Sequence, residues 1–249
     1  MNGVFAGVPT PVPSPTVAVV LPVLNEASCL GEGLADLRQN HSADEILVVD
    51  GGSTDASIEM VCRLMSEGVG DAQAVPCLLQ TPRGRGRQMH VGALAANSDV
   101  LLFLHADVRL PQGAVEAVRA AIRQGYLWGR FDVRLSGRNF LFCLIERLMN
   151  TRSSLTRIAT GDQAIFVRRD VYLMLGGYAP MDIMEDIEFS TRLKWVGRPA
   201  RFHGQVTVSA RRWEEKGIIR TVLLMWTLRL LYWLGVSPAR LGRWYYRLP

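Results

Sequence analysis

The segment Glu45–Asp55 (EILVVDGGSTD) constrains the fold of this chain more than any other part of its sequence. Four apolar residues, 46–49, lead directly to Asp50 and a pair of glycines. Such a run is typical of a strand buried on both faces of a parallel sheet, and the glycines indicate a tight turn at its carboxyl end. Asp50 is therefore expected at a strand tip, where the ligand crevice of open α/β sheets lies. A simpler interpretation is that Asp50 and Asp55 only cap the turn and the following helix.

Two other predicted strands also end next to acids. Residues 17–22 (VAVVLP) are followed by Glu26, and residues 99–104 (DVLLFL) are followed by His-Ala-Asp at 105–107. Because β and α segments alternate through the first 125 residues, the sequence predicts an α/β fold with a doubly wound, mostly parallel sheet and helices on both faces. The acids at positions 26, 50 and 107 are then expected along one rim of that sheet.

The remaining elements follow from hydrophobic periodicity and turn signals. Helices are expected over residues 27–40, 54–66, from the end of the 81–88 loop to 97, from 111 onward, over 139–152 and over 187–196, and further strands over 74–80, 129–135, 163–168 and 206–210. Residues 1–16 carry four prolines and no apolar core of signal-peptide length, which predicts a flexible, extended lead-in. The chain therefore divides into this lead-in, a domain over 17–213 and a tail over 214–249.

Composition limits the class of protein. With 249 residues, of which 49% are apolar, the chain is long enough to bury a substantial core. Its four cysteines lack the paired spacing of a zinc site, which favours a reducing, cytoplasmic compartment. The formal net charge is +5, but residues 211–249 carry eight Lys or Arg against two Glu, so the first 210 residues sum to about −1.

The tail adds aromatic side chains to this positive charge, including four of the six Trp residues. This combination suits an anionic membrane surface better than a nucleic-acid groove, so no nucleic-acid partner is expected. Residues 216–234 are helical by propensity, but their uncharged runs fall short of the roughly 20 residues that a bilayer crossing needs. Two interpretations stay open: the tail lies in the membrane interface as a peripheral contact, or it packs on the domain or in a homodimer.

An arginine-rich loop at 81–88 and the acid Asp107 together indicate phosphate chemistry. Mg²⁺ and Mn²⁺ prefer carboxylate oxygen and often share a diphosphate, so Asp107 with a bound metal would hold a pyrophosphate. The planar donors to the same phosphates would be Arg83, Arg87 and Arg212. Glu26 and Asp50 would contact the hydroxyls and N–H groups of a nucleoside. The alternative is a solvated arginine loop and a turn cap at Asp107 before Pro111.

A second acidic pair, Glu185–Asp186, stands at the start of the predicted helix 187–196. Acids in a first helical turn are favoured by the helix dipole alone, so this pair needs no further explanation. If the helix start faces the rim, however, one of the two carboxylates would deprotonate a hydroxyl as a general base.

Taken in order, seven segments resemble the family 2 glycosyltransferases. They are VVLPVLNE, ILVVDGGSTD, GRGRQMHVGA, LLFLHAD, TGDQAIFVRR, MED and ARRW. The resemblance covers roughly Val17 to Trp213, and is greatest to a bacterial subgroup of short, single-domain members. It implies a GT-A fold, with a nucleotide-sugar-binding half over 17–125 and an acceptor-binding half over 126–213, and inversion at the anomeric carbon.

The resemblance also implies roles for individual residues. Asp186 matches the base of the family's ED motif, with Glu185 beside it, and Asp107 matches the metal-binding second acid of its DxD motif. The nucleotide-binding residues would be Pro22, Glu26, Asp50, Gly51, Ser53, Asp55, Arg83, Arg87 and Ala106. The phosphate and acceptor residues would be Gly161, Asp162, Gln163, Arg211, Arg212 and Trp213. His105 stands where a DxD motif has its first Asp, and is expected to ligate the metal or to form a hydrogen bond.

The predicted activity is transfer of one sugar, of hexosyl type, from a nucleotide diphosphate sugar, with Mn²⁺ or Mg²⁺ as cofactor. The acceptor would be a hydroxyl or phosphate, and the tail favours a lipid-linked one, reached from the inner face of the plasma membrane. Ser209 replaces the Gln of the processive enzymes' QxxRW motif, which argues against processive synthesis. The alternatives are a nucleotidyltransferase, whose glycine-rich loop is missing after the first strand, and a non-catalytic nucleotide-sugar-binding module at the membrane surface.

Overall fold

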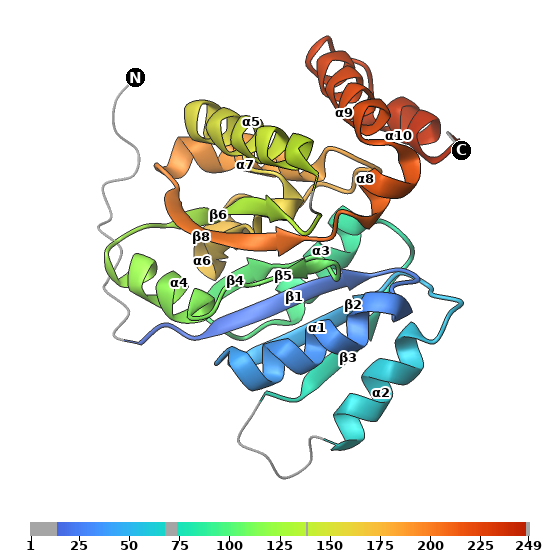
Figure 1. The fold of residues 1–249 in the computed structure, drawn as a ribbon. Coiled ribbons are helices and arrows are strands. Elements are labelled where there is room, and N and C mark those ends of the chain that lie inside the picture. The colour runs from blue at the N-terminus through green and yellow to red at the C-terminus, as the bar shows by residue number, and fades with distance from the viewer. Residues whose placement is uncertain (1–13, 68–73, 138, 248–249) are drawn as a thin grey trace.

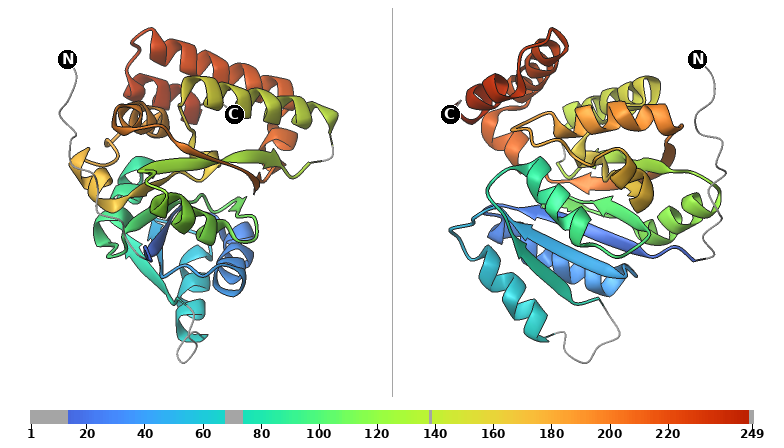
Figure 2. Two further views of the ribbon diagram at one scale, coloured as in Figure 1. Left: turned by 90° about the vertical axis from the view of Figure 1, so that its left-hand side faces the viewer. Right: turned by 180° about the vertical axis from the view of Figure 1, so that it is seen from behind.

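The structure is a computed structural model that describes residues 14–67, 74–137 and 139–247. The greater part of the predicted lead-in, residues 1–13, lies outside the described residues. Among the described residues, one eight-stranded sheet runs in the order β3-β2-β1-β4-β7-β6-β8-β5, with helices on both faces (Figures 1 and 2). The predicted α/β class is confirmed.

The first half of the sheet is parallel. Its strands are β1 (Val17–Val23), β2 (Glu45–Asp50), β3 (Pro76–Gln80) and β4 (Val100–Phe103), and the helices between them are α1 (Ala27–Asn40), α2 (Ser57–Glu67) and α3 (Arg85–Ala95). Strand β1 pairs in parallel with both β2 and β4, and β2 pairs in parallel with β3. The carboxyl ends of these four strands therefore meet at one edge, as the sequence predicts.

Alternate residues of β1 face two separate cores, which explains why the strand is apolar throughout. Val17, Val19 and Leu21 pack with the buried leucines of α1, whereas Ala18 and Val20 pack with α3 on the other face. The buried leucines of α1 are Leu30, Leu34 and Leu37, a spacing that places them on one side of a helix. Each fully buried side chain of this kind stabilises the folded state by about 1.5–3 kcal/mol compared with the same side chain left exposed.

The second half of the sheet is mixed. Its elements are β5 (Val108–Arg109), α4 (Ala114–Arg123), β6 (Trp128–Leu135), α5 (Phe140–Thr156), the 3₁₀ turn η1 (Gly161–Gln163), β7 (Phe166–Arg168), α6 (Arg169–Met174), α7 (Glu185–Val196) and β8 (Ala200–Val208). Strand β7 runs antiparallel to both β4 and β6, while β6 and β8 are parallel. Strand β7 therefore joins the two halves into one sheet.

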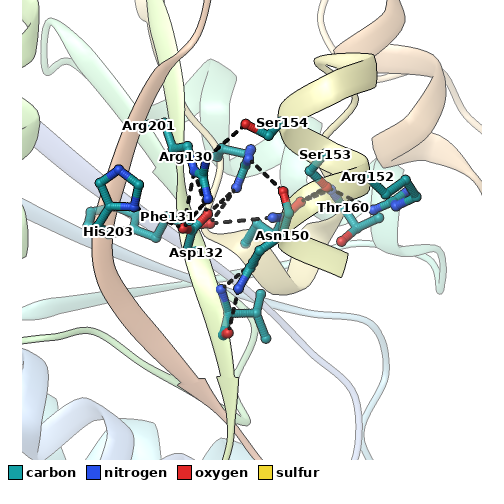
Figure 3. Close-up of polar contacts among 12 residues, drawn as sticks. Arg130, Phe131, Asp132, Asn150, Arg152, Ser153, Ser154, Thr160, Arg201 and His203 are labelled. Carbon is teal, nitrogen blue, oxygen red and sulfur yellow. Dashed lines mark hydrogen bonds and ion pairs between the residues drawn. The ribbon is translucent and has the colours of Figure 1, made fainter. Parts of the chain in front are cut away.

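A buried charge network fixes β6, β8 and α5 to one another (Figure 3). The carboxylate of Asp132 accepts hydrogen bonds from Arg130 at 2.8 Å and from Arg201 at 2.8 Å. Asn150 on α5 pairs with both backbone groups of Val133, its Oδ1 accepting at 2.9 Å and its Nδ2 donating at 3.0 Å. These bonds satisfy polar groups that would otherwise be costly to bury.

The tail is helical, as predicted, and consists of α8 (Arg211–Lys216), α9 (Ile218–Trp233) and α10 (Pro238–Arg247). All three views place α9 and α10 at the end of the molecule where α5 lies (Figures 1 and 2). Within the described part of the chain, no helix has both the length and the apolar character needed to cross a membrane. The four cysteines are all free thiols.

Some predicted boundaries were wrong. Helix α3 begins at Arg85, inside the expected 81–88 loop, because the glycines at 84 and 86 obscure its start in the sequence. Helix α2 begins three residues late, at Ser57, because Asp55 caps it. Strand β8 begins at Ala200 rather than 206, and η1 occupies the start of the strand expected over 163–168.

Candidate functional site

Two loops at the carboxyl edge of the sheet hold each other in place. The loop after β1 donates backbone N–H groups to side chains of the loop after β2: Asn25 to Ser53 Oγ, Glu26 to Ser57 Oγ and Ala27 to Asp55 Oδ2, at 2.9–3.0 Å. In the opposite direction, the backbone N–H of Thr54 donates a hydrogen bond to Asn25 Oδ1 at 2.8 Å. Ser53 and Asp55, both predicted to bind nucleotide, therefore position the loop that carries Glu26.

Asp50 is buried, and its carboxylate accepts from the backbone N–H groups of Gly52 at 2.8 Å and Ser53 at 3.1 Å. This arrangement matches the turn-capping interpretation. Neither Asp50 nor Gly51 lines the pocket described below, so a nucleotide contact for them stays a prediction.

The buried side chain of Gln88 holds the carboxyl ends of β1 and β2 together. Its Nε2 donates to the carbonyl oxygens of Val23 at 2.7 Å and Val49 at 2.8 Å. A Cβ on Gly51 would come within 3.0 Å of the same amide, so Gly51 leaves room for it. Gln88 was not among the predicted site residues, because a glutamine inside a helix carries no signal in the sequence.

A pocket of about 170 Å³ opens at this edge, between the sheet and the tail. It is lined by Pro22, Glu26, Arg85, His105, Ala106, Asp107, Thr160, Gly161, Asp162, Ile183–Ile187, Met225, Leu228, Arg229, Tyr245 and Tyr246. Three acids that are far apart in the sequence, Glu26, Asp107 and Asp186, thus share one cavity.

Two backbone N–H groups donate hydrogen bonds that hold the carboxylate of Asp186 at the start of α7. Its Oδ2 accepts from the backbone N–H of Gly161 at 2.8 Å, and its Oδ1 accepts from the N–H of Ile187 at 2.7 Å. The neighbouring Glu185 is only 3% exposed, and burial together with the charge of Asp186 raises its pKa. Arg85 lies 3.8 Å from Glu185 and opposes that rise. Of the two acids, Asp186 is the less buried and is therefore the better placed to meet a ligand.

The predicted acceptor residues 161–163 lie on η1, where Gly161 and Gln163 are buried and Asp162 is partly exposed. Gln163 is buried, and its Oε1 accepts from Ser153 Oγ at 2.8 Å and from the backbone of Thr160 at 3.1 Å. Gln163 therefore holds the turn from which Gly161 reaches Asp186. Asp162 lines the pocket beside His105, and although burial alone would raise its pKa, the bond from His105 lowers it.

The two ring nitrogens of His105 have different surroundings. Its Nδ1 lies 3.5 Å from Asp162 Oδ1, while its Nε2 is buried and has no hydrogen-bond partner among the described residues. No three His, Cys, Asp or Glu side chains in the described ranges are grouped closely enough to hold a metal by themselves. Mg²⁺ and Mn²⁺ often use one or two protein ligands and complete their shell with substrate phosphates and water. One nitrogen of His105 and one carboxylate of Asp107 in the same pocket fit such a shared site.

The arginines of the 81–88 segment have different surroundings. Arg85, which was not predicted as a site residue, lines the pocket. Arg83 is exposed and stacks over the ring of Tyr246 at 4.7 Å, and Arg87 is exposed outside the pocket lining. The three arginines, one before α3 and two on it, therefore have separate surroundings, and phosphate binding by Arg83 and Arg87 stays a prediction.

The predicted phosphate and acceptor residues 211–213 do not come together in one place either. Arg211 donates to Ser28 Oγ at 2.9 Å, which ties α8 to α1. Trp213 packs against the core and does not line the pocket. The side chain of Arg212 lies outside the described residues, so its predicted role is not tested.

The tail forms one wall of the pocket. Arg229 and Leu228 on α9, and Tyr245 and Tyr246 on α10, line it. Tyr246 Oη lies 3.3 Å from the backbone oxygen of Asp182, which anchors α10 to the loop before α7. Packing of the tail on the domain, one of the two open interpretations, is thus observed. Nothing in the local sequence pattern places these residues at the site, because the contact joins segments more than 60 positions apart.

Gly161→Ala is expected to lower the free energy of unfolding by about 1–3 kcal/mol, because it overpacks the site. A Cβ at this position would lie 2.4 Å from His105 Cε1, so the ring or η1 must move. The matched control is Gly31→Ala in α1, where the Cβ would make an ordinary contact with Met60 of α2 and should stabilise the helix. Urea unfolding of both variants checks the prediction, and equal stabilities would contradict it.

Comparisons with known proteins agree with this arrangement. The family model "Glycosyl transferase family 2" matches residues 18–172. The chain is 27% identical over 133 residues to an uncharacterized glycosyltransferase of Haemophilus influenzae, covering 53% of this chain and 50% of that protein. It is 29% identical over 118 residues to the undecaprenyl-phosphate 4-deoxy-4-formamido-L-arabinose transferase of Salmonella paratyphi A, covering 46% of this chain and 36% of that protein. The chain thus spans half or less of the length of these relatives.

Solved structures share the fold. A mannosyltransferase from Pyrobaculum calidifontis, in complex with GDP-Man and Mn²⁺, superimposes with a TM-score of 0.60 at 23% identity, covering 80% of this chain and 57% of that one. S. aureus TarS in complex with UDP-GlcNAc gives a TM-score of 0.62 at 16% identity, covering 78% of this chain and 58% of that one. Both support a GT-A fold. Since the family model matches more than half of the sequence, the chain belongs to glycosyl transferase family 2.

Proposed function

We propose that this chain is an inverting glycosyltransferase that moves a single hexosyl group from a nucleoside diphosphate sugar to a hydroxyl or phosphate of a lipid-linked acceptor. One observation carries the proposal: Glu26, Asp107 and Asp186, from three separate segments, line the same pocket. Glu26 follows β1 and is placed to accept hydrogen bonds from a nucleoside. Asp107 follows β4 and is placed beside a diphosphate.

In the proposed reaction an acceptor oxygen attacks the anomeric carbon while the bond from that carbon to the diphosphate oxygen breaks. Asp186 takes the acceptor proton as general base, and the Gly161 N–H holds its carboxylate in position. The guanidinium groups of Arg85 and Arg229 line the same pocket and stabilise negative charge on the departing diphosphate. A single displacement of this kind inverts the configuration of the anomeric carbon.

A divalent cation fits the donor side of this pocket. Asp107, with the free nitrogen of His105, would hold Mn²⁺ or Mg²⁺, and the ion would supply charge stabilisation at the leaving oxygens. The Mn²⁺ in the Pyrobaculum calidifontis complex supports this assignment by analogy.

The tail suggests where the enzyme works. Trp233 is 81% exposed and Ile219 is 68% exposed on α9, and the tail is basic, so we propose peripheral attachment to the inner face of the plasma membrane from the cytoplasm. The lipid-phosphate substrate in the name of the Salmonella paratyphi A relative is in line with this placement. Flotation with anionic vesicles tests it: protein that stays unbound would limit the tail to its role as a pocket wall.

The donor is tested by thermal-shift screening of UDP, GDP, dTDP and CDP sugars with Mn²⁺, followed by measurement of released nucleotide. We expect one class of nucleotide sugar to raise the melting temperature of the protein. The same nucleotide should be released slowly in the presence of acceptor lipid. A protein that none of these donors stabilises would overturn the proposed function.

Asp107→Ala is expected to weaken metal-dependent nucleotide binding at least about tenfold, since a charged ligand contact is worth roughly 1.5–3 kcal/mol. Calorimetry of the nucleoside diphosphate with and without Mn²⁺ gives the readout. The control is Asp170→Ala, which removes an exposed acid outside the pocket lining. If the wild-type protein binds nucleotide equally well with and without Mn²⁺, the metal assignment is wrong.

A further inference from the structure

A second cavity, of about 570 Å³, lies between α5 and α9 and adjoins the pocket. The two cavities share Asp107, Asp162, Met225 and Arg229 in their linings. The apolar walls of the second cavity, here named the α5–α9 groove, are Ile145, Leu148, Met149 and Leu155 from α5 and Val222, Met225 and Trp226 from α9. A largely apolar cavity therefore adjoins the pocket that contains Asp186.

Two arginines stand at the inner end of this groove. Arg152 and Arg229 both line it, and Arg229 also lines the pocket. Burial and the charge of Arg229 lower the pKa of Arg152 to about 10, so the two cations lie close enough to repel each other. Arg152 donates to Ser153 Oγ at 2.9 Å, but its Nε is buried without a hydrogen-bond partner. Within the described ranges neither guanidinium forms an ion pair with a carboxylate.

The mouth of the groove opens onto an exposed apolar face. On α5, Phe140 is 79% and Leu155 is 80% exposed, and Leu144 and Leu148 continue the same side of the helix. On α9, Leu223, Trp226, Leu230 and Trp233 are exposed, again at helical spacing. Leu148, Leu155 and Trp226 belong both to this face and to the groove, so these side chains connect the two apolar surfaces.

We infer that the α5–α9 groove binds the acceptor, and that the acceptor is a membrane lipid in which a phosphate joins the apolar chain to a hydroxyl-bearing head group. The chain lies along the groove, and the phosphate meets Arg152 and Arg229, whose charges it neutralises. The head group then extends past Arg229 into the pocket, where its hydroxyl reaches Asp186. This assignment rests on the proposed function and specifies its acceptor.

The chemistry balances with the donor already named. The head-group oxygen forms a bond to the anomeric carbon, the bond between that carbon and the diphosphate oxygen breaks, and the nucleoside diphosphate leaves with the electron pair. The proton of the hydroxyl goes to Asp186. The lipid phosphate takes no part in the bond changes and serves only to place the hydroxyl.

The test uses the full chain and a short-chain phosphatidylglycerol below its micelle concentration, titrated by calorimetry. Arg152→Gln is expected to weaken lipid binding about tenfold, the usual scale for a hydrogen bond between two charged groups. Arg147→Gln removes the same charge from an exposed position on the same helix and should bind like the wild type. The affinity for nucleotide sugar should be unchanged in both variants.

Two tryptophan substitutions on α9 test whether lipid binding depends on the groove itself or on α9 in general. Val222→Trp fills the groove and should abolish lipid binding, whereas Thr227→Trp adds the same ring at an exposed position outside it and should not. Thermal unfolding and nucleotide affinity report whether each variant is folded. Lipid binding that survives Val222→Trp, or that falls equally with Arg152→Gln and Arg147→Gln, would overturn the inference.

Failure of the inference can be told from failure of the proposed function. A wild-type protein that binds and turns over nucleotide sugar but does not bind the phospholipid retains the function and refutes the groove assignment. A protein that binds no nucleotide sugar refutes both. If sedimentation shows a dimer that Val222→Trp dissociates, the groove is occupied by a second copy and the lipid assignment is wrong.

Discussion

Asp186→Asn is expected to lower the rate of sugar transfer at least about 10²-fold, the usual scale for loss of a general base, while nucleotide affinity stays nearly unchanged. The Asn side chain has the shape of Asp and can still accept from the backbone N–H of Gly161 or Ile187, so the start of α7 should remain in place. It cannot take the acceptor proton. Steady-state release of nucleoside diphosphate, with calorimetry of the donor complex, separates the two effects.

Glu185→Gln is the matched control, because it makes the same change one residue away. Glu185 is buried in the pocket lining, whereas Asp186 is partly exposed, so an acceptor hydroxyl reaches Asp186 more easily. Its replacement should cost less turnover than that of Asp186. If turnover survives Asp186→Asn but is lost in Glu185→Gln, the role of base passes to Glu185.

Asp132→Ala is expected to lower the free energy of unfolding by about 3–5 kcal/mol, the scale measured when one partner of a buried ion pair is removed. Asp132 is 5% exposed, and its loss would leave the buried Arg130 guanidinium without its carboxylate partner. Asp170→Ala, which breaks an exposed pair with Arg168, should cost no more than about 1 kcal/mol. Denaturant unfolding of the two variants at neutral pH makes the comparison, and similar losses would contradict it.

The same network gives this prediction a pH dependence. Burial alone would raise the pKa of Asp132, but the hydrogen bonds from Arg201 and Arg130 outweigh it and hold the pKa below its usual value. A depressed carboxylate pKa stabilises the folded state fully above the unfolded value of about 3.9, and the contribution falls as the pH drops toward the lower folded value. The difference between wild type and Asp132→Ala should therefore shrink only in strongly acidic solution.

The sequence predicts most of the first half of the fold because its signals there are local. The bounds of α1 agree with the structure at both ends, since a strand, an exit loop and an amphipathic helix follow one another without interruption. Adjacent parallel strands bring their carboxyl ends together by geometry alone, and this is why Glu26 and Asp107 could be placed at one rim. Asp50 fits the same pattern, but the turn after it uses its carboxylate.

What the sequence does not predict depends on tertiary contacts. Gln88 reaches the ends of two strands across the sheet, and no period or motif marks a residue of this kind. Arg85 could not be told from Arg83 and Arg87, because the start of α3 and its orientation decide which arginine lines the cavity. The wall formed by Tyr245 and Tyr246 depends on how α10 folds back onto the loop at Asp182.

The position of that wall has a consequence for how the pocket is built. The family model ends at residue 172, whereas Arg229, Tyr245 and Tyr246 come from outside the matched region. The cavity is therefore a composite of the matched region and of the segment that follows it. A chain shortened before α9 would keep Glu26 and Asp107 but would lose one side of the cavity.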